Sequence, residues 1–584
     1  MVYVLRSRLF YVASKSASNK LSLLHLSQRS VRTLTTTANK SRDSLKSGGR
    51  LLRKRNVALV SGVIIVGSYI SFNQSSYYNL DTLPSKADAS GIAGSQRSLS
   101  TSSMIGDDKR YFSTSTSSMF QQNSISHQQH KEGVFLLNDE QVSRKLREFE
   151  ESFFVNRGRG VTRYDICQLA SNSPIEDDRA EEIVQVPLLQ DNNIKTNTDW
   201  MFFGIFDGHG GWTTSGKLRD QLISYVIHEL GSVFKPAGEE NFRYIPTSAT
   251  IDQAIKNGFL KLDHEIVNKN IEKLLTNNNK AKAAELLMPA LSGSCALLSF
   301  YDTNSKLLKV AVTGDSRAIL GSFKDNKWTV RQLSIDQTAA NPTEVAKIIS
   351  EHPDEPNVIK NGRVLGTLEP SRAFGDCRYK LPASIQDRIY KQFFGRKLPN
   401  NLKSPPYVTA EPVITTTKID PENNEFLVMA SDGLYEMLSN EEIVGLVVKW
   451  MEKEKMLKPQ TSFWNFGFTQ ADNKLPDVAD VTADKASKKP IRKQKQTGTN
   501  LGYLLEDKNV ATHLIRNAIS NGGSKEQTSM LISIPSPTSR RYRDDLTVTV
   551  VFFGSDHKVE HKTGKLEING DATTGGIEGS KPKL

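Results

Sequence analysis

The chain has 584 residues, and its 76 Lys and Arg against 64 Asp and Glu give a formal net charge of +12. The excess lies at one end, because residues 1–56 hold 13 of the cationic side chains and one acid, while the remaining 528 residues hold 63 of each sign. Nucleic acid is therefore not an expected partner, since the main part of the chain has no cationic excess to neutralise phosphates. Three widely spaced cysteines, Cys167, Cys295 and Cys377, offer neither a disulfide framework nor a CxxC metal site.

The first 42 residues contain eight Lys and Arg, no acid, and many Ser, Thr and Leu. This composition is typical of a mitochondrial presequence, which import receptors recognise and the membrane potential draws inward. We therefore expect residues 1–56 to be a presequence with a basic flank, and the mitochondrial import machinery to be a partner. A disordered basic arm is the alternative.

An uncharged apolar stretch follows at residues 57–72, VALVSGVIIVGSYISF. It is slightly shorter than the roughly 17–25 residues that span a bilayer as a helix, and the uncharged residues up to 76 extend it. We interpret 57–76 as a transmembrane or sorting segment in the mitochondrial inner membrane; a buried core helix is the alternative. The preceding basic cluster would stay in the matrix, which favours the intermembrane space for the rest of the chain.

Residues 77–132 are rich in Ser, Gln, Asn and Thr and poor in large aliphatic residues. Such a segment cannot bury enough apolar surface to fold, so we expect a disordered linker. Residues 557–584 are expected to be a flexible tail. The chain ends in Pro-Lys-Leu, a weak variant of the peroxisomal Ser-Lys-Leu signal, which leaves the peroxisome as an alternative location.

Acidic residues repeatedly stand where an apolar run typical of a β-strand stops. The runs at 200–206, 307–312 and 425–430 are closely followed by Asp207-Gly208, Gly314-Asp315 and Asp432-Gly433, and Asp544 precedes the run at 546–553. Such carboxylates can converge at one edge of a sheet, and their oxygen atoms suit Mg²⁺ or Mn²⁺. One Asp-Gly pair alone is more simply a turn, but the repetition favours a metal site. The candidate ligands are Asp207, Asp432, Asp544 and Glu176.

Eight motifs resemble, in their order, those of type 2C (PPM) metal-dependent Ser/Thr protein phosphatases. They are Asn172-Ser-Pro-Ile-Glu-Asp-Asp178, Phe206-Asp-Gly-His-Gly-Gly211, Ser292-Gly-Ser-Cys-Ala296, Thr313-Gly-Asp-Ser-Arg317, Ser371-Arg-Ala-Phe-Gly-Asp376, Ala410-Glu-Pro412, Ala430-Ser-Asp-Gly433 and Arg543-Asp-Asp545. Within this family the chain looks most like the mitochondrial pyruvate dehydrogenase phosphatase branch, on the stretches 169–177, 506–516 and 542–545.

The resemblance implies an α+β fold, a four-layer α-β-β-α sandwich of two antiparallel sheets covered by helices, with a binuclear metal site at the sheet edge. The catalytic domain is expected at residues 133–556, with insertions at about 378–404 and 451–500. The first insertion would lie near the active-site mouth and contribute to substrate choice. The second becomes polar and rich in Lys, which indicates a solvated loop or a docking surface for an acidic partner.

The resemblance also implies a set of metal ligands. Asp207 would bridge two Mn²⁺ or Mg²⁺ ions, and a water between the ions would attack the phosphorus of phosphoserine or phosphothreonine. Glu176 and the Gly208 carbonyl would hold one ion, and Asp432 and Asp544 the other. No phosphorylated enzyme intermediate is expected, because the water is the nucleophile.

Two more residues belong to the predicted site. Asp315 would help Asp432 to hold a third, weaker ion, or would instead satisfy loop amides and pair with Arg317. His209 is the candidate general acid that protonates the leaving serine oxygen. The alternatives are a structural histidine in the turn and a histidine that merely orients Asp207.

Two positions depart from the pattern of many relatives. Asn172 stands where they carry an Arg that binds the substrate phosphate. Asn can donate a hydrogen bond but not a charge-assisted pair, so we expect Asn172 to contact the phosphate weakly and the metals to provide most of the affinity. Asp545 stands where many relatives carry Asn and adds a charge beside the site.

The predicted function is a metal-dependent mitochondrial protein Ser/Thr phosphatase whose implied substrate is the E1α subunit of the pyruvate dehydrogenase complex. That complex lies in the matrix, whereas the expected anchor directs the catalytic domain to the intermembrane space. The matrix therefore stays open as a location. The alternatives are a different substrate in the intermembrane space or the peroxisome, and a weakly catalytic tethering protein.

Overall fold

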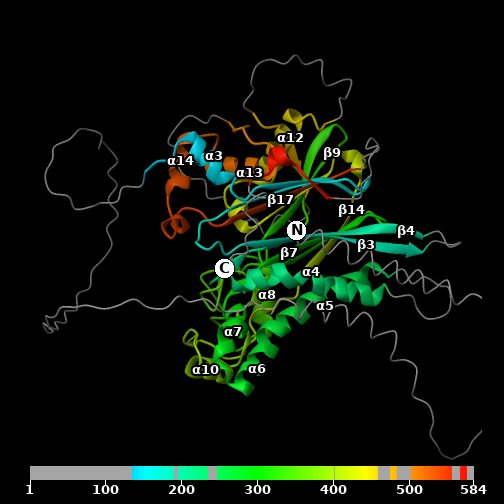
Figure 1. Cartoon of the computed structure of the whole chain (residues 1–584). Coiled ribbons are helices and arrows are strands. Elements are labelled where there is room, and N and C mark those ends of the chain that lie inside the picture. The colour runs from blue at the N-terminus through cyan, green and yellow to red at the C-terminus, as the bar shows by residue number, and fades with distance from the viewer. Residues whose placement is uncertain are drawn as a thin grey trace, which may run out of the picture. The chain divides into compact units, whose positions relative to one another are not determined.

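Two β-sheets pack face to face, and helices cover the outer face of each sheet (Figure 1). The computed structural model describes residues 135–189, 195–234, 246–399, 401–457, 474–482, 502–554 and 566–574, all of which belong to one compact unit. The predicted presequence, the apolar segment at 57–72, the linker at 77–132 and the terminal Pro-Lys-Leu lie outside these residues.

The larger sheet has the strand order β16-β10-β9-β15-β17-β2-β1-β18. These strands are β1 Glu151–Val155, β2 Val161–Leu169, β9 Arg317–Lys324, β10 Lys327–Gln332, β15 Phe426–Ala430, β16 Val478–Asp480, β17 Leu546–Phe553 and β18 Leu566–Ile568. The smaller sheet has the order β14-β8-β7-β4-β3. Its strands are β3 Asp178–Leu189, β4 Lys195–Phe206, β7 Ala296–Asp302, β8 Leu307–Thr313 and β14 Val413–Lys418.

Two short sheets flank this sandwich. One has three strands in the order β13-β6-β5, namely β5 Gly208–His209, β6 Gly293–Ser294 and β13 Phe374–Gly375. The other pairs β11 Ile359–Lys360 with β12 Arg363–Val364. The three-stranded sheet matters most for function, because it ties three of the sequence motifs together.

Helices form the two outer layers. The larger sheet is covered by α3 Asp139–Leu146, α12 Asn440–Lys453, α13 Val510–Ser520 and α14 Lys525–Ser533. The smaller sheet is covered by α4 Thr213–Val233, α5 Ser248–His264, the π-turn η1 Glu265–Lys269, α6 Asn270–Asn277 and α7 Ala283–Leu291. Figure 1 shows α12 and α13 on one side of the sandwich and α4 and α5 on the other.

The remaining elements connect these layers. They are α8 Pro342–Glu351, α9 Cys377–Lys380, α10 Ala383–Gln392, α11 Asp432–Tyr435, and the short turns η2 Lys280–Lys282, η3 Pro421–Asn423, η4 Thr538–Arg541 and η5 Gly570–Ala572. The α+β class and the helix–sheet–sheet–helix order agree with the prediction.

The core between the two sheets explains why the central strands read as continuous apolar runs. Met201 and Leu297 of the smaller sheet and Leu427 and Val551 of the larger sheet are fully buried in one shared cluster. Because β17 contacts helices on its other face, all eight of its residues are buried. Strands covered on both faces lose the apolar–polar alternation of a half-exposed strand.

Local signals placed several elements correctly. The predicted capping box begins α12, where the N–H of Glu442 donates to Ser439 Oγ (3.1 Å) and the N–H of Ser439 donates to Glu442 Oε2 (2.8 Å). The helical spacing within residues 506–520 corresponds to α13, which begins at Val510 and is buried along its whole length. Its N-terminal residues are preceded by the capping Asn509.

The prediction of two purely antiparallel sheets is wrong at one edge. Strand β16 pairs with β10 in parallel, with Trp328 opposite Val478, whereas the other neighbouring strands of the two large sheets are antiparallel. β16 lies within the insertion at 451–500, so its described part is not only a solvated loop. The chain reaches β16 after α12 has crossed the sheet, and such a crossover produces a parallel neighbour.

The prediction of a flexible tail is wrong for residues 566–574. Strand β18 pairs with β1, with Phe153 opposite Ile568, and the Asn509 side chain donates to the Ala572 carbonyl (3.0 Å). Ala572 is buried. This segment satisfies the unpaired backbone groups of β1, which would otherwise form the sheet edge.

None of the helices in the described parts of the chain is both long enough and apolar enough to cross a membrane. The predicted membrane segment at 57–72 is not among those parts.

Candidate active site

Asp207 stands directly after β4, at the point where the chain turns into the three-stranded sheet. The N–H of Cys295 donates to the Asp207 carbonyl (2.8 Å), which fixes this loop against the strand β6 region. Gly208 leaves no space for a side chain, because a Cβ there would lie 2.2 Å from the Glu176 carbonyl oxygen. The Asp-Gly step therefore lets the two predicted ligand-bearing loops approach each other closely.

Carboxylates from three separate loops meet at Asp207. Carboxylate oxygens of Asp207, Asp315 and Asp432 lie within 4.8 Å of one another. Asp207 follows a strand of the smaller sheet, Asp432 follows β15 of the larger sheet, and Asp315 lies in the turn from β8 to β9 that joins the sheets. The cluster thus lies at the edge that the two sheets share, where the strand-end pattern predicted it.

The electrostatics of this cluster favour a bound cation. Burial and the charges of Asp177 and Asp432 raise the pKa of Asp207 well above its ordinary value. Burial and Asp432 likewise raise the pKa of Asp544 to about 7, although Arg540 acts in the opposite direction. Hard oxygen donors concentrated in this way fit a divalent ion such as Mg²⁺ or Mn²⁺.

The other two predicted carboxylate ligands flank the cluster. Asp544 belongs to the same electrostatic group but forms an ion pair with Arg540. Glu176 accepts a bond from the N–H of Gly211 (2.8 Å) and another from the Asn172 side chain (3.3 Å), and burial raises its pKa. Neither residue falls within the 4.8 Å group of Asp207 among the described residues.

Asp545 organises the loop that carries Glu176, a role that the sequence did not reveal. Its carboxylate is 2% exposed and accepts bonds from the N–H groups of Ser171 (2.5 Å), Asn172 (3.0 Å) and Glu176 (2.9 Å). The Asn172 side chain also donates to it (3.2 Å). Asp545 therefore fixes the turn from Ser171 to Glu176, and its extra charge is matched by backbone donors.

The predicted general acid, His209, has a carboxylate partner. Its Nε2 lies 2.7 Å from Asp376 Oδ2, at the end of the Ser371–Asp376 motif. Burial lowers the pKa of His209, but the charge and hydrogen bond of Asp376 more than offset this, and the net shift is upward. This shift favours the protonated form, which an acid needs, over a wider pH range than in a free histidine.

Asp315 has a buried thiol among its neighbours. The thiol of Cys295 donates to its carboxylate (3.2 Å). Arg317 forms a two-bond pair with Asp336 and also donates to Asn440. The guanidinium of Arg317 therefore has Asp336 as its two-bond partner, and the charge of Asp315 acts on it more weakly.

A family model described as protein phosphatase 2C matches residues 179–499, more than half of the chain. The chain belongs to the protein phosphatase 2C family.

Three curated relatives span most of this phosphatase. A Saccharomyces cerevisiae protein named mitochondrial pyruvate dehydrogenase (acetyl-transferring) phosphatase 1 is 45% identical, over 89% of either chain. A protein phosphatase 2C homologue of Schizosaccharomyces pombe is 42% identical, over 70% of this chain and 84% of the relative. Human mitochondrial pyruvate dehydrogenase phosphatase 2 is 30% identical, over 72% of this chain and 84% of the relative.

Residues 378–404, where an insertion was expected, contain Arg396, which lies near Gly210 in the loop after Asp207. A Cβ built on Gly210, next to His209, would lie 3.8 Å from a guanidinium nitrogen of Arg396. Two aromatic side chains near the catalytic motifs are also partly exposed, Trp212 by 37% and Tyr542 by 52%. Arg396 thus lies near the loop after Asp207, and Trp212 and Tyr542 present exposed rings close in sequence to Asp207 and Asp544.

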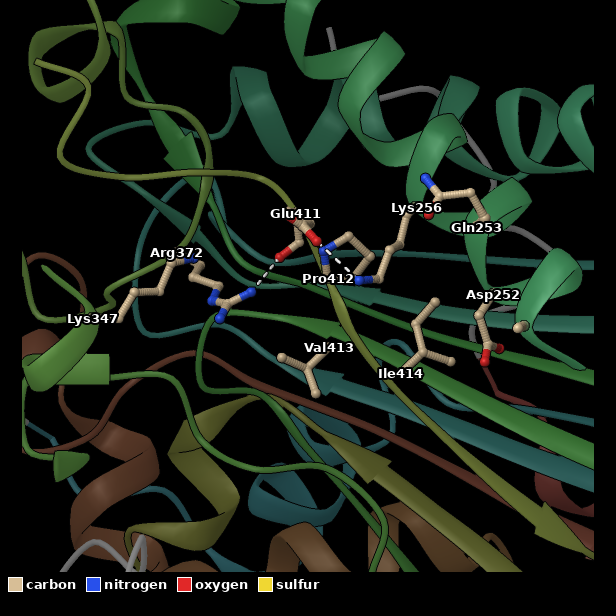
Figure 2. A pocket seen from close by; sticks show the side chains of 10 residues that line it. Asp252, Gln253, Lys256, Lys347, Arg372, Glu411, Pro412, Val413 and Ile414 are labelled. Atoms are coloured by element: carbon tan, nitrogen blue, oxygen red, sulfur yellow. Dashed lines mark hydrogen bonds and ion pairs between the residues drawn. The ribbon is translucent and has the colours of Figure 1, made fainter. Parts of the chain in front are cut away.

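A separate cavity of about 430 Å³ lies between α5, Lys347 of α8 and the chain entering β14 (Figure 2). Lys256 donates to the Glu411 carboxylate and Arg372 to the Glu411 carbonyl, both at 2.9 Å. Arg372 also forms a two-bond pair with Glu344. None of the predicted metal ligands lines this cavity, and its arginine serves to hold two of the phosphatase 2C motifs together.

Proposed function

We propose that this protein is a metal-dependent Ser/Thr phosphatase of mitochondria that dephosphorylates the E1α subunit of pyruvate dehydrogenase. The substrate assignment rests on the 45% identity, over 89% of both chains, to a yeast protein that is named for that activity. Human relatives with the same name support it. The cluster of Asp207, Asp315 and Asp432, which could hold a metal ion, supports the proposed metal-dependent chemistry.

The carboxylates have the first task in this reaction. Asp207, Gly208 and Glu176 would hold one divalent cation and Asp207, Asp432 and Asp544 a second, with Asp315 and Asp432 available to a third. Such cations lower the pKa of a water and stabilise negative charge as phosphorus is attacked. The short turns after β4 and β15 keep these side chains at fixed positions, so little reorganisation is needed when a substrate binds.

His209 has the second task, the transfer of a proton. The serine oxygen that leaves phosphorus is a strong base and needs a proton as the bond breaks. His209 would donate it, and Asp376 would keep the imidazole protonated and correctly turned through the 2.7 Å contact. Asn172 would lie near the phosphate, but its amide already donates to Glu176 and Asp545.

The test uses the purified chain with phosphorylated pyruvate dehydrogenase complex and, separately, a panel of unrelated phosphoserine proteins. We expect phosphate release in Mn²⁺ or Mg²⁺, none in chelator, and none from Asp207→Asn. Preference for the E1α phosphoserines supports the proposed substrate. Release from the panel but not from E1α would reject that substrate while leaving the phosphatase activity in place.

The location within mitochondria is a second part of the proposal. The relatives with mitochondrial names support the organelle. The expected membrane segment at 57–72 favours the intermembrane space, whereas a pyruvate dehydrogenase substrate requires the matrix. Protease treatment of intact and of outer-membrane-ruptured mitochondria separates these outcomes. If the protein is digested only after the outer membrane has been ruptured, the catalytic domain lies in the intermembrane space. That result would contradict the proposed substrate.

A further inference from the structure

We propose that Arg540 binds the substrate phosphate in this active site, an inference that rests on the proposed phosphatase function. Arg540 lies in the turn η4, four residues before Asp544. Its guanidinium forms an ion pair with the Asp544 carboxylate, and 44% of its side chain is exposed. A partly exposed cation thus lies beside one of the predicted metal ligands.

Arg540 acts electrostatically on both sides of the predicted metal site. It counteracts the effect of burial on the pKa of Asp544 and also on the pKa of Glu176, which belongs to a different loop. Burial lowers the pKa of Arg540, but the charge and hydrogen bond of Asp544, and more weakly the charge of Asp432, raise it overall. The ion pair with Asp544 places the guanidinium at the edge of this group of carboxylates, which is where we expect a phosphate to bind.

Asn172 is a weaker candidate for this role, because it carries no charge and its amide contacts two carboxylates. Its amide nitrogen donates to Glu176 Oε2 (3.3 Å) and to Asp545 Oδ2 (3.2 Å). A side-chain amide has two N–H donors, so both are in use. An uncharged amide cannot form a charge-assisted pair with phosphate, so another residue has to supply the positive charge.

Arg540 is paired with Asp544, and a bound metal ion would displace it from that carboxylate. Asp544 is a predicted ligand, and a divalent cation bound to its carboxylate would compete with the guanidinium for the same oxygens. The released Arg540 has five planar N–H donors that match two phosphate oxygens at once. Because nearly half of its side chain is exposed, it can turn toward a substrate without disturbing the core.

The neighbouring arginines are less suitable. Arg543 is 3% exposed, two of its guanidinium nitrogens are buried without a hydrogen-bond partner, and burial lowers its pKa to about 10. It cannot meet a bulky phosphoprotein. Arg541 is exposed on the same turn as Arg540, but it has no ion pair with any of the described residues, which makes it a matched control.

The experiment compares Arg540→Gln and Arg540→Lys with Arg541→Gln in the full chain. Binding of inorganic phosphate to the Mn²⁺-loaded proteins is measured by calorimetry, and binding of Mn²⁺ to the metal-free proteins is measured in parallel. We expect phosphate to bind at least about tenfold more weakly to Arg540→Gln, within twofold of wild type to Arg541→Gln, and at an intermediate strength to Arg540→Lys. The affinity of Arg540→Gln for Mn²⁺ should be unchanged or higher, because the guanidinium no longer competes with the ion for the Asp544 carboxylate.

Two results would overturn the inference. Unchanged phosphate affinity in Arg540→Gln would show that the guanidinium does not contact the phosphate. A parallel loss of Mn²⁺ affinity would show that Arg540 acts through the metal ligands. Phosphate binding is measured without turnover, so failure of the wild-type protein to hydrolyse phosphoproteins would count against the proposed function and not against this inference.

Discussion

His209 and Asp376 are separated by 167 residues in the chain, yet His209 Nε2 lies 2.7 Å from Asp376 Oδ2. The three-stranded sheet brings them together, because β5 contains His209 and β13 ends directly before Asp376, with β6 between the two strands. The pair is partly buried, with side-chain exposures of 26% for His209 and 9% for Asp376. The contact fixes the orientation of the imidazole, as the proposed transfer of a proton to the leaving serine oxygen requires.

Replacing His209 by Gln should reveal this role through the leaving group. We expect hydrolysis of a phosphoserine peptide to slow by about 10²–10⁴-fold, since the serine oxygen needs the proton. Hydrolysis of p-nitrophenyl phosphate should slow far less, because nitrophenolate leaves without one. Steady-state rates with both substrates are the measurement. Equal losses would instead indicate a histidine that only orients Asp207.

Gly293 should tolerate no side chain, because it lies directly against the His209–Asp376 pair. A Cβ at Gly293 would be 2.1 Å from His209 Nε2 and 2.5 Å from Asp376 Oδ2. Gly293→Ala should therefore separate the pair and lower activity toward phosphoserine. Gly231→Ala is the matched control, because the α4 position has open space around it, and a helical Ala should stabilise the protein by roughly 0.5–1 kcal/mol. Full activity in Gly293→Ala would contradict the proposed proton path.

Asp207→Asn should have opposite effects on the metal-free and metal-loaded proteins. The raised pKa of Asp207 means that its charged form is disfavoured in the folded state, so its contribution to stability falls as pH rises. Removing the charge should stabilise the metal-free protein at pH 8 by on the order of 1 kcal/mol, and less at lower pH. Added Mn²⁺ should stabilise wild type and not the variant. Chemical unfolding with and without Mn²⁺ measures both effects, and equal Mn²⁺ stabilisation would remove Asp207 from the ligand set.

His513 should make the fold sensitive to mild acid. It is fully buried in α13, lies 3.1 Å from the Leu446 carbonyl, and burial lowers its pKa to about 4. An unfolded histidine titrates near 6.5, so the unfolded state binds more protons between these values. Stability should be complete above pH 6.5 and fall by up to about 3 kcal/mol as pH decreases to 4. The free energy of unfolding of His513→Gln should depend less on pH over this range, and parallel curves would contradict the assignment.

Truncation should show that the C-terminal strand belongs to the fold. Ending the chain after residue 565 removes β18 and exposes the backbone groups of β1, together with the Asn509 donor that binds the Ala572 carbonyl. We expect a loss of on the order of 1–3 kcal/mol in unfolding free energy. A chain that ends after Thr574 keeps these contacts and should match the full chain. Equal stability of both truncations would mean that this segment is dispensable.

Much of the site could be read from spacing along the chain. The apolar runs before Asp207 and Asp432, and the glycines beside them, identified strand ends and sharp turns without reference to distant residues. The capping box of α12 was likewise visible, since Ser439 and Glu442 lie within one turn. These features depend on the backbone within a few residues, which local sequence determines.

The tertiary structure decided which side chains are partners. Asp545 looked like an extra charge beside a ligand, but it fixes the loop that carries Glu176, and Asn172 is engaged by both. Arg540, which the sequence did not single out, lies against Asp544. Likewise, the parallel pairing of β16 and the return of residues 566–574 to β1 depend on where the chain re-enters the sheet.

The physical reason for this division is the range of the interactions. Turn geometry, capping and apolar periodicity act over a few residues, so the amino-acid order alone specifies them. Ion pairs and hydrogen bonds such as His209–Asp376 form only after two sheets have packed and strand register has brought distant loops to one edge. The sequence thus determined the family and the carboxylates at the strand ends, and the packing of the sheets determined how those residues meet.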